Sequence, residues 1–185
     1  AADEAAVAKE YEEKVTAILG PTEIGSDHIR ALPRLGYLPL EIRAVEEGSV
    51  VPVKNALLTI TNTLPEFYWV VGFVESLLLK IWYPITVATH SRQYLDTVTA
   101  AFEKTVDKEQ HALIPWMVHD FGYRGDSSEE GAAISGAAHL LSFSGSDTIP
   151  ARAFVEEYYG AFPVMGSVPA SEHSVMCSFG PEGEL

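Results

Sequence analysis

Residues 116–160 read WMVHDFGYRGDSSEEGAAISGAAHLLSFSGSDTIPARAFVEEYYG. This stretch places a short apolar run before a polar loop and a helical pattern, and then repeats that order once. The order strand, loop, helix, strand, loop, helix is typical of a parallel α/β sheet or barrel. Ligands in such folds bind at the loops that follow the carboxyl ends of the strands. We therefore expect the functional residues in 119–124 and 146–147.

The elements of this stretch can be placed from its pattern. Ser127 is followed three positions later by Glu130, and this spacing forms a capping box at the start of a helix. The small residues that follow continue the helical pattern. We expect strands at 116–118 and 141–143 and helices at 131–140 and 150–159.

The upstream residues predict further elements. Apolar residues at helical spacing predict an amphipathic helix over 1–19, and Gly20 with Pro21 marks its end. Short alternating runs between 38 and 61 predict two or three antiparallel strands. The helix expected over 66–82 is apolar on nearly every side, which predicts that it is buried between this sheet and the rest of the chain.

The pattern divides the chain into three parts. Residues 1–37 are a helical segment, and residues 38–84 hold the antiparallel strands and the central apolar helix. Residues 85–185 begin with another amphipathic helix over 90–108 and continue into the α/β stretch. The predicted fold class is therefore α/β, with an attached antiparallel sheet.

The composition excludes several classes of function. The 185 residues are 47% hydrophobic and 21% charged, which is typical of a soluble globular protein. A formal net charge of −14 repels nucleic acid and anionic membranes. No run of eighteen apolar residues and no secretory signal is visible. The single Cys177 indicates a reducing compartment, so we expect a cytoplasmic protein.

Histidine and cysteine give no sign of a metal site. The six histidines and one cysteine lack the spacing of metal ligands. His139 lies among small helical residues, where a hydrogen-bonded packing role is the commoner one. Cys177 is expected to be a small buried residue, because no neighbour in sequence would activate its thiol.

Four motifs occur in one order: YPITVAT at 83–89, HDFGYRG at 119–125, GSDT at 145–148 and SVPASEHS at 167–174. Together with residues 38–69, they resemble successive signatures of the nicotinamide phosphoribosyltransferase family. The resemblance implies part of an irregular parallel α/β barrel of the type II phosphoribosyltransferases. It also implies a glycosyltransferase of NAD salvage, which joins nicotinamide to phosphoribosyl pyrophosphate and yields nicotinamide mononucleotide and pyrophosphate.

The resemblance assigns substrate-binding roles to four residues. Phe121 would stack on the nicotinamide ring, and Asp147 would accept the N–H of its amide. Ser167 would hydrogen-bond the same carboxamide. Arg124 would carry positive charge toward the ribose-phosphate side. His119 belongs near the same site.

The resemblance also assigns the catalytic phosphorylation site. His173 would accept a phosphoryl group from ATP, because an imidazole can be neutral and nucleophilic near pH 7. In the family, ATP and Mg²⁺ are bound mainly by sequence that this chain lacks, as is most of the phosphoribosyl group. A C-terminal half or a second chain is therefore expected to complete the site, in a homodimer or a hetero-assembly.

Three functions remain open at this point. The first is nicotinamide phosphoribosyl transfer by an assembly that contains this chain. The second is the same transfer to nicotinate, and the third is a non-catalytic fragment that dimerises or binds. Asp147 separates the first two, since its negative charge would repel the carboxylate of nicotinate.

Overall fold

The structure is a computed structural model of the chain, and it describes residues 3–162 and 164–183. It contains both helices and strands, in agreement with the predicted α/β class. The chain divides into two compact units, residues 1–80 and residues 81–185. Each unit is described by itself.

The first unit is mainly helical, with one pair of strands. Its elements are α1 (Glu4–Leu19), α2 (Asp27–Leu35), β1 (Leu40–Ala44), β2 (Leu58–Asn62), the short 3-10 helix η1 (Pro65–Phe67), α3 (Val70–Leu78) and the 3-10 helix η2 (Leu79–Ile81). The side chain of Asp3 caps α1 by accepting a hydrogen bond from the backbone N–H of Ala5. Gly20 ends the helix with a φ of 81°, a conformation that favours glycine. The predicted helix over 1–19 is therefore confirmed for Glu4–Leu19, while residues 1 and 2 lie outside the described residues.

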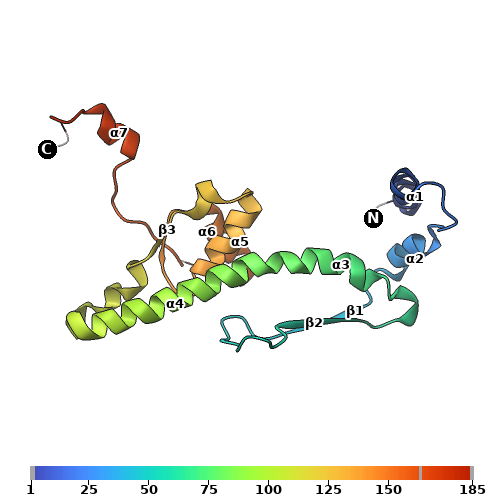
Figure 1. Cartoon of the computed structure of the whole chain (residues 1–185), viewed down its shortest axis with the longest axis horizontal. Coiled ribbons are helices and arrows are strands. Elements are labelled where there is room, and N and C mark those ends of the chain that lie inside the picture. The colour runs from blue at the N-terminus through green and yellow to red at the C-terminus, as the bar shows by residue number, and fades with distance from the viewer. Residues whose placement is uncertain (1–2, 163, 184–185) are drawn as a thin grey trace. The chain divides into compact units, whose positions relative to one another are not determined.

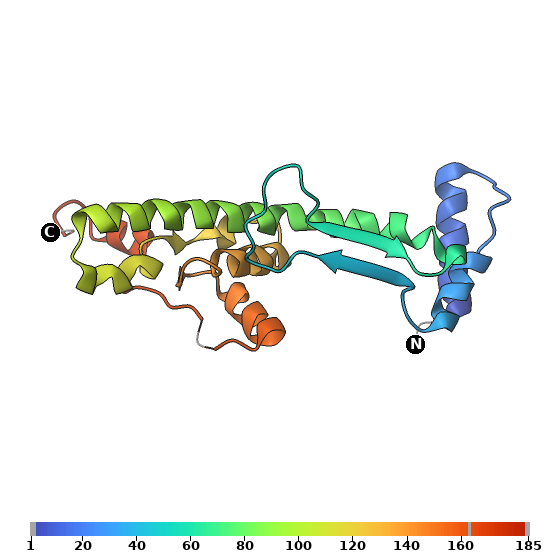
Figure 2. The same ribbon diagram turned by 90° about the horizontal axis from the view of Figure 1, so that it is seen from below.

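The strands β1 and β2 form the antiparallel pair that the alternating pattern predicts. Their register places Leu40 opposite Asn62 and Ala44 opposite Leu58. The two strands lie side by side in both views (Figures 1 and 2). β1 ends at Ala44 and β2 begins at Leu58, and an irregular connection joins the two strands.

A row of aromatic side chains joins the helices of this unit. Tyr11 of α1 contacts His28 of α2, with ring centroids 5.3 Å apart. His28 contacts Trp69 at 5.0 Å, and Trp69 contacts Phe73 of α3 at 5.6 Å. All three pairs are edge to face, the arrangement that aromatic quadrupoles favour. Residues far apart in sequence are thus held together by edge-to-face contacts.

The helix expected over 66–82 is broken into η1, α3 and η2, and most of its surface is exposed. Val70 and Phe67 are buried, but Phe73, Leu77 and Leu79 are exposed, and Leu77 retains 71% of its accessible surface. Its expected burial is therefore absent in this chain. The reason is geometric, because apolar residues lie all around the helix and the contacts of β2 cover only part of it.

By length and composition, the helical stretch Val70–Thr105 could cross a membrane.

The second unit contains the stretch that was expected to form a parallel sheet. Its elements are α4 (Trp82–Thr105), the 3-10 helix η3 (Lys108–Trp116), β3 (His119–Asp120), the 3-10 helix η4 (Gly122–Gly125), α5 (Glu129–His139), β4 (Gly145–Ser146), α6 (Ile149–Tyr159) and α7 (His173–Ser178). In Figure 1, α5 lies beside α4, and α6 packs against α5. The helices predicted at 131–140 and 150–159 are confirmed as α5 and α6.

The parallel pairing is confirmed, although its strands begin later than predicted. β3 pairs with β4 in parallel, with His119 opposite Gly145 and Asp120 opposite Ser146. Gly166 adds a third parallel bridge on the other side of Gly145. The described residues show this small sheet and not a closed barrel.

The displaced elements have local causes. Residues 141–143 complete the end of α5, because the backbone N–H groups of Ser142 and Phe143 both donate to the carbonyl of His139. Trp116 ends η3 instead of starting a strand. The capping residue of α5 is Ser128 and not Ser127, since the Ser128 hydroxyl accepts the N–H of Gly131 at 3.0 Å. The predicted capping box is therefore wrong by one position.

The helices α5 and α6 approach closely at Gly136. A Cβ atom at this position would lie 2.6 Å from the Cβ of Ala151 and 3.1 Å from Cγ2 of Thr148. Ala151 and Thr148 are themselves almost fully buried. The absence of a side chain at Gly136 therefore permits the close packing of α5 against the start of α6.

We expect Gly136→Ala to destabilise the second unit by about 1–3 kcal/mol, because the added methyl group overpacks a well-filled contact. Gly72→Ala in α3 is the matched control, since among the described residues nothing beyond its chain neighbours and the backbone of its own helix lies within 4 Å of its Cβ position. That change should be neutral or stabilising by up to about 1 kcal/mol through helix propensity. Chemical unfolding measures both. Equal effects of the two changes would contradict the close contact at Gly136.

Candidate active site

The carboxyl ends of the parallel segments bring together three of the predicted site residues. Phe121 follows β3, Asp147 follows β4, and Ser167 follows the bridge at Gly166. The Ser167 hydroxyl donates a hydrogen bond to the carboxylate Oδ1 of Asp147. Sequence positions up to 46 residues apart thus meet at one edge of a small sheet, where α/β folds place ligands.

Asp147 also contacts a histidine. Nε2 of His119 lies 3.2 Å from Oδ1 of Asp147, and the side chains of His119 and Asp147 are 12% and 42% exposed. Nε2 has no partner that meets hydrogen-bond geometry, so the pair is a close electrostatic contact and not an aligned hydrogen bond. The hydroxyl of Ser167, followed by His119, holds the pKa of Asp147 below its usual value. Asp147 is therefore an anionic acceptor at neutral pH.

Phe121 offers an accessible aromatic face. Its side chain is 64% exposed, and its ring centroid lies 4.5 Å from that of His119 at an interplanar angle of 35°. A cavity of about 270 Å³ lies beside this pair. Its lining comes from α4, β3 and α5 and their neighbours: Val87, His90, Ser91, Tyr94, Val118, His119, Asp120, Phe121 and His139. A flat ring can therefore approach Phe121 from solvent.

Asp120 connects the two loops that carry Phe121 and Asp147. Its Oδ1 accepts the backbone N–H of Gly122 at 2.8 Å, and its Oδ2 accepts the hydroxyl of Ser146 at 3.1 Å. Its backbone carbonyl accepts the N–H of Asp147 at 2.9 Å. Asp120 lies within the expected functional loop 119–124, but the family resemblance assigns it no role of its own. Its place at the end of a strand, directly before the expected ring platform, is the signal that could have singled it out.

His139 contacts the strand β4 that carries Asp147 at its end. It is buried, its Nε2 lies 3.1 Å from the carbonyl oxygen of Gly145, and its Nδ1 lies 3.4 Å from the hydroxyl of Ser91. Burial lowers the pKa of His139, which favours the neutral imidazole. A neutral ring can donate from Nε2 to the carbonyl and accept from Ser91 at Nδ1. The expected hydrogen-bonded packing role of His139 is confirmed.

Arg124 and His173 lie apart from the group around Asp147. Arg124 is exposed in η4, and His173 is exposed as the first residue of α7. Glu172 caps α7, and its pKa is lowered chiefly by the hydroxyl of Ser174, with a smaller contribution from the charge of Arg124. Within residues 3–162 and 164–183, no hydrogen bond or ion pair joins His173 to Asp147. The structure therefore relates Arg124 to the His173 segment only through a weak electrostatic interaction.

Cys177 differs from its expected environment. It is exposed, not buried, and its sulfur lies 3.6 Å from Nε2 of His173. The two residues are four positions apart on α7, which places them on one face of the helix. The i, i+4 spacing of His173 and Cys177 is the sequence signal for this contact, but it applies only once the segment is known to be helical.

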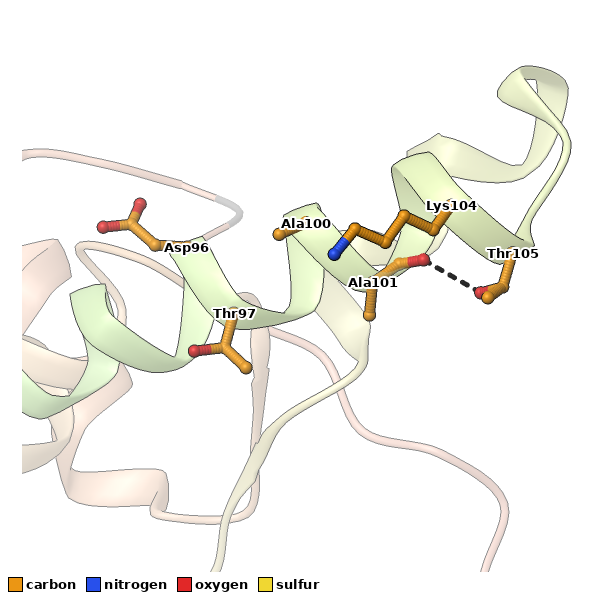
Figure 3. Close-up of a pocket in the computed structure, with 6 residues that line it drawn as sticks. All are labelled: Asp96, Thr97, Ala100, Ala101, Lys104 and Thr105. Carbon is orange, nitrogen blue, oxygen red and sulfur yellow. Dashed lines mark hydrogen bonds between the residues drawn. The ribbon is translucent and has the colours of Figure 1, made fainter.

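Besides the residues around Asp147, a metal site or a second pocket could serve a function. The described part of the chain has no group of three or more His, Cys, Asp or Glu residues that could hold a metal ion. A larger hollow of about 630 Å³ lies along α4 and is lined by Asp96, Thr97, Ala100, Ala101, Lys104 and Thr105 (Figure 3). All six residues come from one helix, so the hollow has a single wall and no converging polar groups.

We expect Ser167→Ala to raise the pKa of Asp147, because the hydroxyl that stabilises the carboxylate is lost. Ser174→Ala is the matched control, since that hydroxyl stabilises Glu172 instead. It should raise the pKa of Glu172 and leave that of Asp147 unchanged. NMR titration of the side-chain carboxyl carbons measures both. An unchanged Asp147 pKa in Ser167→Ala would contradict the contact.

The sequence of this chain is similar to a known enzyme family and to several curated proteins. The Nicotinate phosphoribosyltransferase (NAPRTase) family matches residues 116–185, a range that contains the five predicted site residues. Curated relatives named nicotinamide phosphoribosyltransferase match more of the chain. The one from Xanthomonas campestris pv. campestris is 47% identical over 151 residues, which cover 81% of this chain and 32% of the relative.

Two further relatives match almost the whole chain. The nicotinamide phosphoribosyltransferase of Acinetobacter baylyi is 40% identical over 185 residues, covering 99% of this chain and 36% of its own length. That of Mycoplasma pneumoniae is 32% identical over 190 residues, covering 97% of this chain and 40% of its own length. The chain is therefore related to the nicotinamide phosphoribosyltransferases, as its four motifs indicate, and it spans about a third of the length of the first two relatives.

Proposed function

We propose that this chain supplies the nicotinamide-binding part of a phosphoribosyltransferase. The complete enzyme would transfer the phosphoribosyl group of phosphoribosyl pyrophosphate to nicotinamide, giving nicotinamide mononucleotide and pyrophosphate for NAD salvage. The observation that carries the proposal is the meeting of an exposed aromatic ring, an anionic carboxylate and a hydroxyl at one sheet edge. These groups come from Phe121, Asp147 and Ser167.

The three groups match the chemistry of nicotinamide. Its flat ring would stack on the open face of Phe121, which contributes about 0.5–1.5 kcal/mol beyond burial. Its amide N–H would donate to Asp147, which accepts but cannot donate. Ser167 already contacts that carboxylate, so it would lie beside the same carboxamide.

The reaction needs little covalent chemistry from the protein. The pyridine nitrogen attacks the anomeric carbon of the ribose, a nitrogen–carbon bond forms, and the carbon–oxygen bond to pyrophosphate breaks. The protein's task is to hold the ring in line with that carbon and to balance the charge of the leaving group. Arg124 would contribute one positive charge, but a chain with a net charge of −14 leaves most phosphate binding to other sequence.

The remainder of the enzyme would therefore come from a larger assembly. We infer that the three parallel segments at β3, β4 and Gly166 belong to an irregular α/β barrel that other sequence completes. A homodimer or a hetero-assembly in the cytoplasm fits the acidic composition and the open site. The exposed apolar surface of α3 agrees with further protein contacts.

ATP and Mg²⁺ enter this proposal only in part. The imidazole of His173 is exposed, so it is accessible to a phosphoryl donor. ATP would supply the phosphoryl group, and His173 would carry it. As the family resemblance implies, Mg²⁺ would be bound mainly by sequence outside this chain, together with the substrate phosphates.

The sister reaction with nicotinate is the second candidate, because the matching family is described by that substrate. The charge of Asp147 disfavours it. The pKa of Asp147 is lowered, so its carboxylate is anionic where nicotinate is also anionic. Two like charges in contact disfavour binding, and more strongly so when water is excluded from the site.

We expect Asp147→Asn, in the complete enzyme, to lower kcat/KM for nicotinamide at least about tenfold and to raise the relative kcat/KM for nicotinate, because it removes a full charge and keeps the shape. Asp96→Asn is the control, since Asp96 forms an exposed ion pair with Arg92 on α4, away from Asp147. Steady-state kinetics with both substrates measures the ratio. A wild-type enzyme that prefers nicotinate would overturn the proposed substrate.

We expect His173→Ala to abolish acid-labile phosphate labelling by ATP and to leave nicotinamide binding within about twofold, because the ring contacts are made elsewhere. Cys177→Ala is the control, since it removes the neighbour of His173 and keeps the imidazole. Mapping of the phosphate adduct after labelling with γ-phosphate-tagged ATP identifies the acceptor. A phosphate on another residue would sink the assignment, and so would a mutant that loses ring binding together with labelling.

A further inference from the structure

We propose that Asp120 is a positioning residue that fixes the separation between the aromatic platform at Phe121 and the carboxylate of Asp147. The inference rests on the proposed function, since it names what holds the nicotinamide site in shape. Asp120 also lines the cavity beside Phe121, but the proposed role is to position other groups and not to bind substrate. Its effect would act through the two loops that it joins.

The contacts of Asp120 reach both loops. One carboxylate oxygen accepts the N–H of Gly122, which fixes the turn directly after Phe121. The other accepts the hydroxyl of Ser146, which is fully buried. The Ser146 hydroxyl in turn accepts the N–H of Thr148 at 3.1 Å. The residues on either side of Asp147 are thus tied to one carboxylate.

The backbone of Asp120 adds a direct link to Asp147. The N–H of Asp147 donates to the Asp120 carbonyl at 2.9 Å, which extends the pairing of β3 and β4 by one residue. Rotation of Asp120 would therefore disturb this bond and the orientation of Phe121 together. Both functional side chains depend on the conformation of a single residue.

The carboxylate of Asp120 lies close to two glycines, Gly122 and Gly136. A Cβ at Gly122 would lie 2.9 Å from its Oδ1, and a Cβ at Gly136 would lie 3.3 Å from its Oδ2. Glycine at both positions makes room for the carboxylate between the η4 turn and α5. The Asp120 side chain therefore occupies this space and holds the η4 turn and the 145–148 segment at a fixed separation through its hydrogen bonds.

Nicotinamide makes this spacing important. Its ring and its carboxamide are joined covalently and cannot adjust their separation, so the platform and the acceptor must be held at a matching distance. A misplacement of about 1 Å in such a site commonly costs on the order of a hundredfold in activity. A loosened Asp120 would thus weaken nicotinamide recognition, while the phosphate groups, bound elsewhere, would be little affected.

The test compares Asp120→Ala with Asp120→Asn in the complete enzyme. Asp120→Ala should raise the KM for nicotinamide at least about tenfold and change the KM for phosphoribosyl pyrophosphate by less than about twofold. Asp120→Asn should recover most of the loss, because the amide oxygen can accept from Gly122 and the amide nitrogen can donate to Ser146. Ser146→Ala combined with Asp120→Ala should be clearly non-additive, since both changes break one contact.

Asp126→Ala is the matched control for lost stability. It also removes a carboxylate that accepts two hydrogen bonds, from the N–H of Ser127 and the hydroxyl of Ser135, but neither group belongs to the 145–148 turn. It should lower the melting temperature without the selective rise in nicotinamide KM. Equal effects of Asp126→Ala and Asp120→Ala on both KM values would reduce Asp120 to a general stabilising residue.

A second measurement separates this proposal from the proposed function. Hydrogen–deuterium exchange of the 145–148 segment should accelerate in Asp120→Ala and remain unchanged in Asp126→Ala, whether or not the enzyme is active. An unchanged exchange rate in Asp120→Ala would overturn the positioning role. A wild-type enzyme that makes no nicotinamide mononucleotide but shows this exchange pattern would overturn the function and leave the Asp120 link established.

Discussion

The parallel pairing of β3 with β4 is the constraint on which the rest of the second unit depends. Each strand is only two residues long, so their pairing includes few backbone hydrogen bonds. The surrounding side chains must therefore hold the register. His139 binds the carbonyl of Gly145 from one side, and Asp120 binds Ser146 from the other. Without that register, Phe121 and Asp147 would not share an edge.

The sequence predicts the order of elements in this unit because hydrophobic periodicity and turn residues are local signals. Helices α5 and α6 are found where their patterns place them, and the parallel arrangement follows from that order. The predicted strands lie earlier in the sequence than the observed ones. In the second case the apolar run 141–143 belongs to the end of α5 and not to a strand. Phe143 is part of the core beneath α5, and the backbone of this segment finishes the helix. Local composition cannot separate these two uses of an apolar run.

The site shows a similar division. The motifs identify Phe121, Asp147 and Ser167, and the structure brings these three together, although their roles in binding stay predictions. Asp120 lies within the expected loop 119–124, but its positioning role depends on contacts with Gly122 and Ser146. The second of these is 26 positions away, and no spacing rule predicts it. A contact of this kind depends on the register of the strands and becomes visible only when the fold is known.

The hydrogen bonds around Asp147 also explain how the proposed site would separate an amide from an acid. Ser167 uses its only hydrogen to reach Asp147, so both residues present acceptors to a ligand. An amide NH2 has two hydrogens and could satisfy a carboxylate oxygen and the hydroxyl oxygen together. The carboxylate of nicotinate has no hydrogen to give, and it brings a second negative charge. Selectivity in such a site would come from the direction of the hydrogen bonds as well as from charge, because a mismatched acceptor pair leaves polar groups without partners.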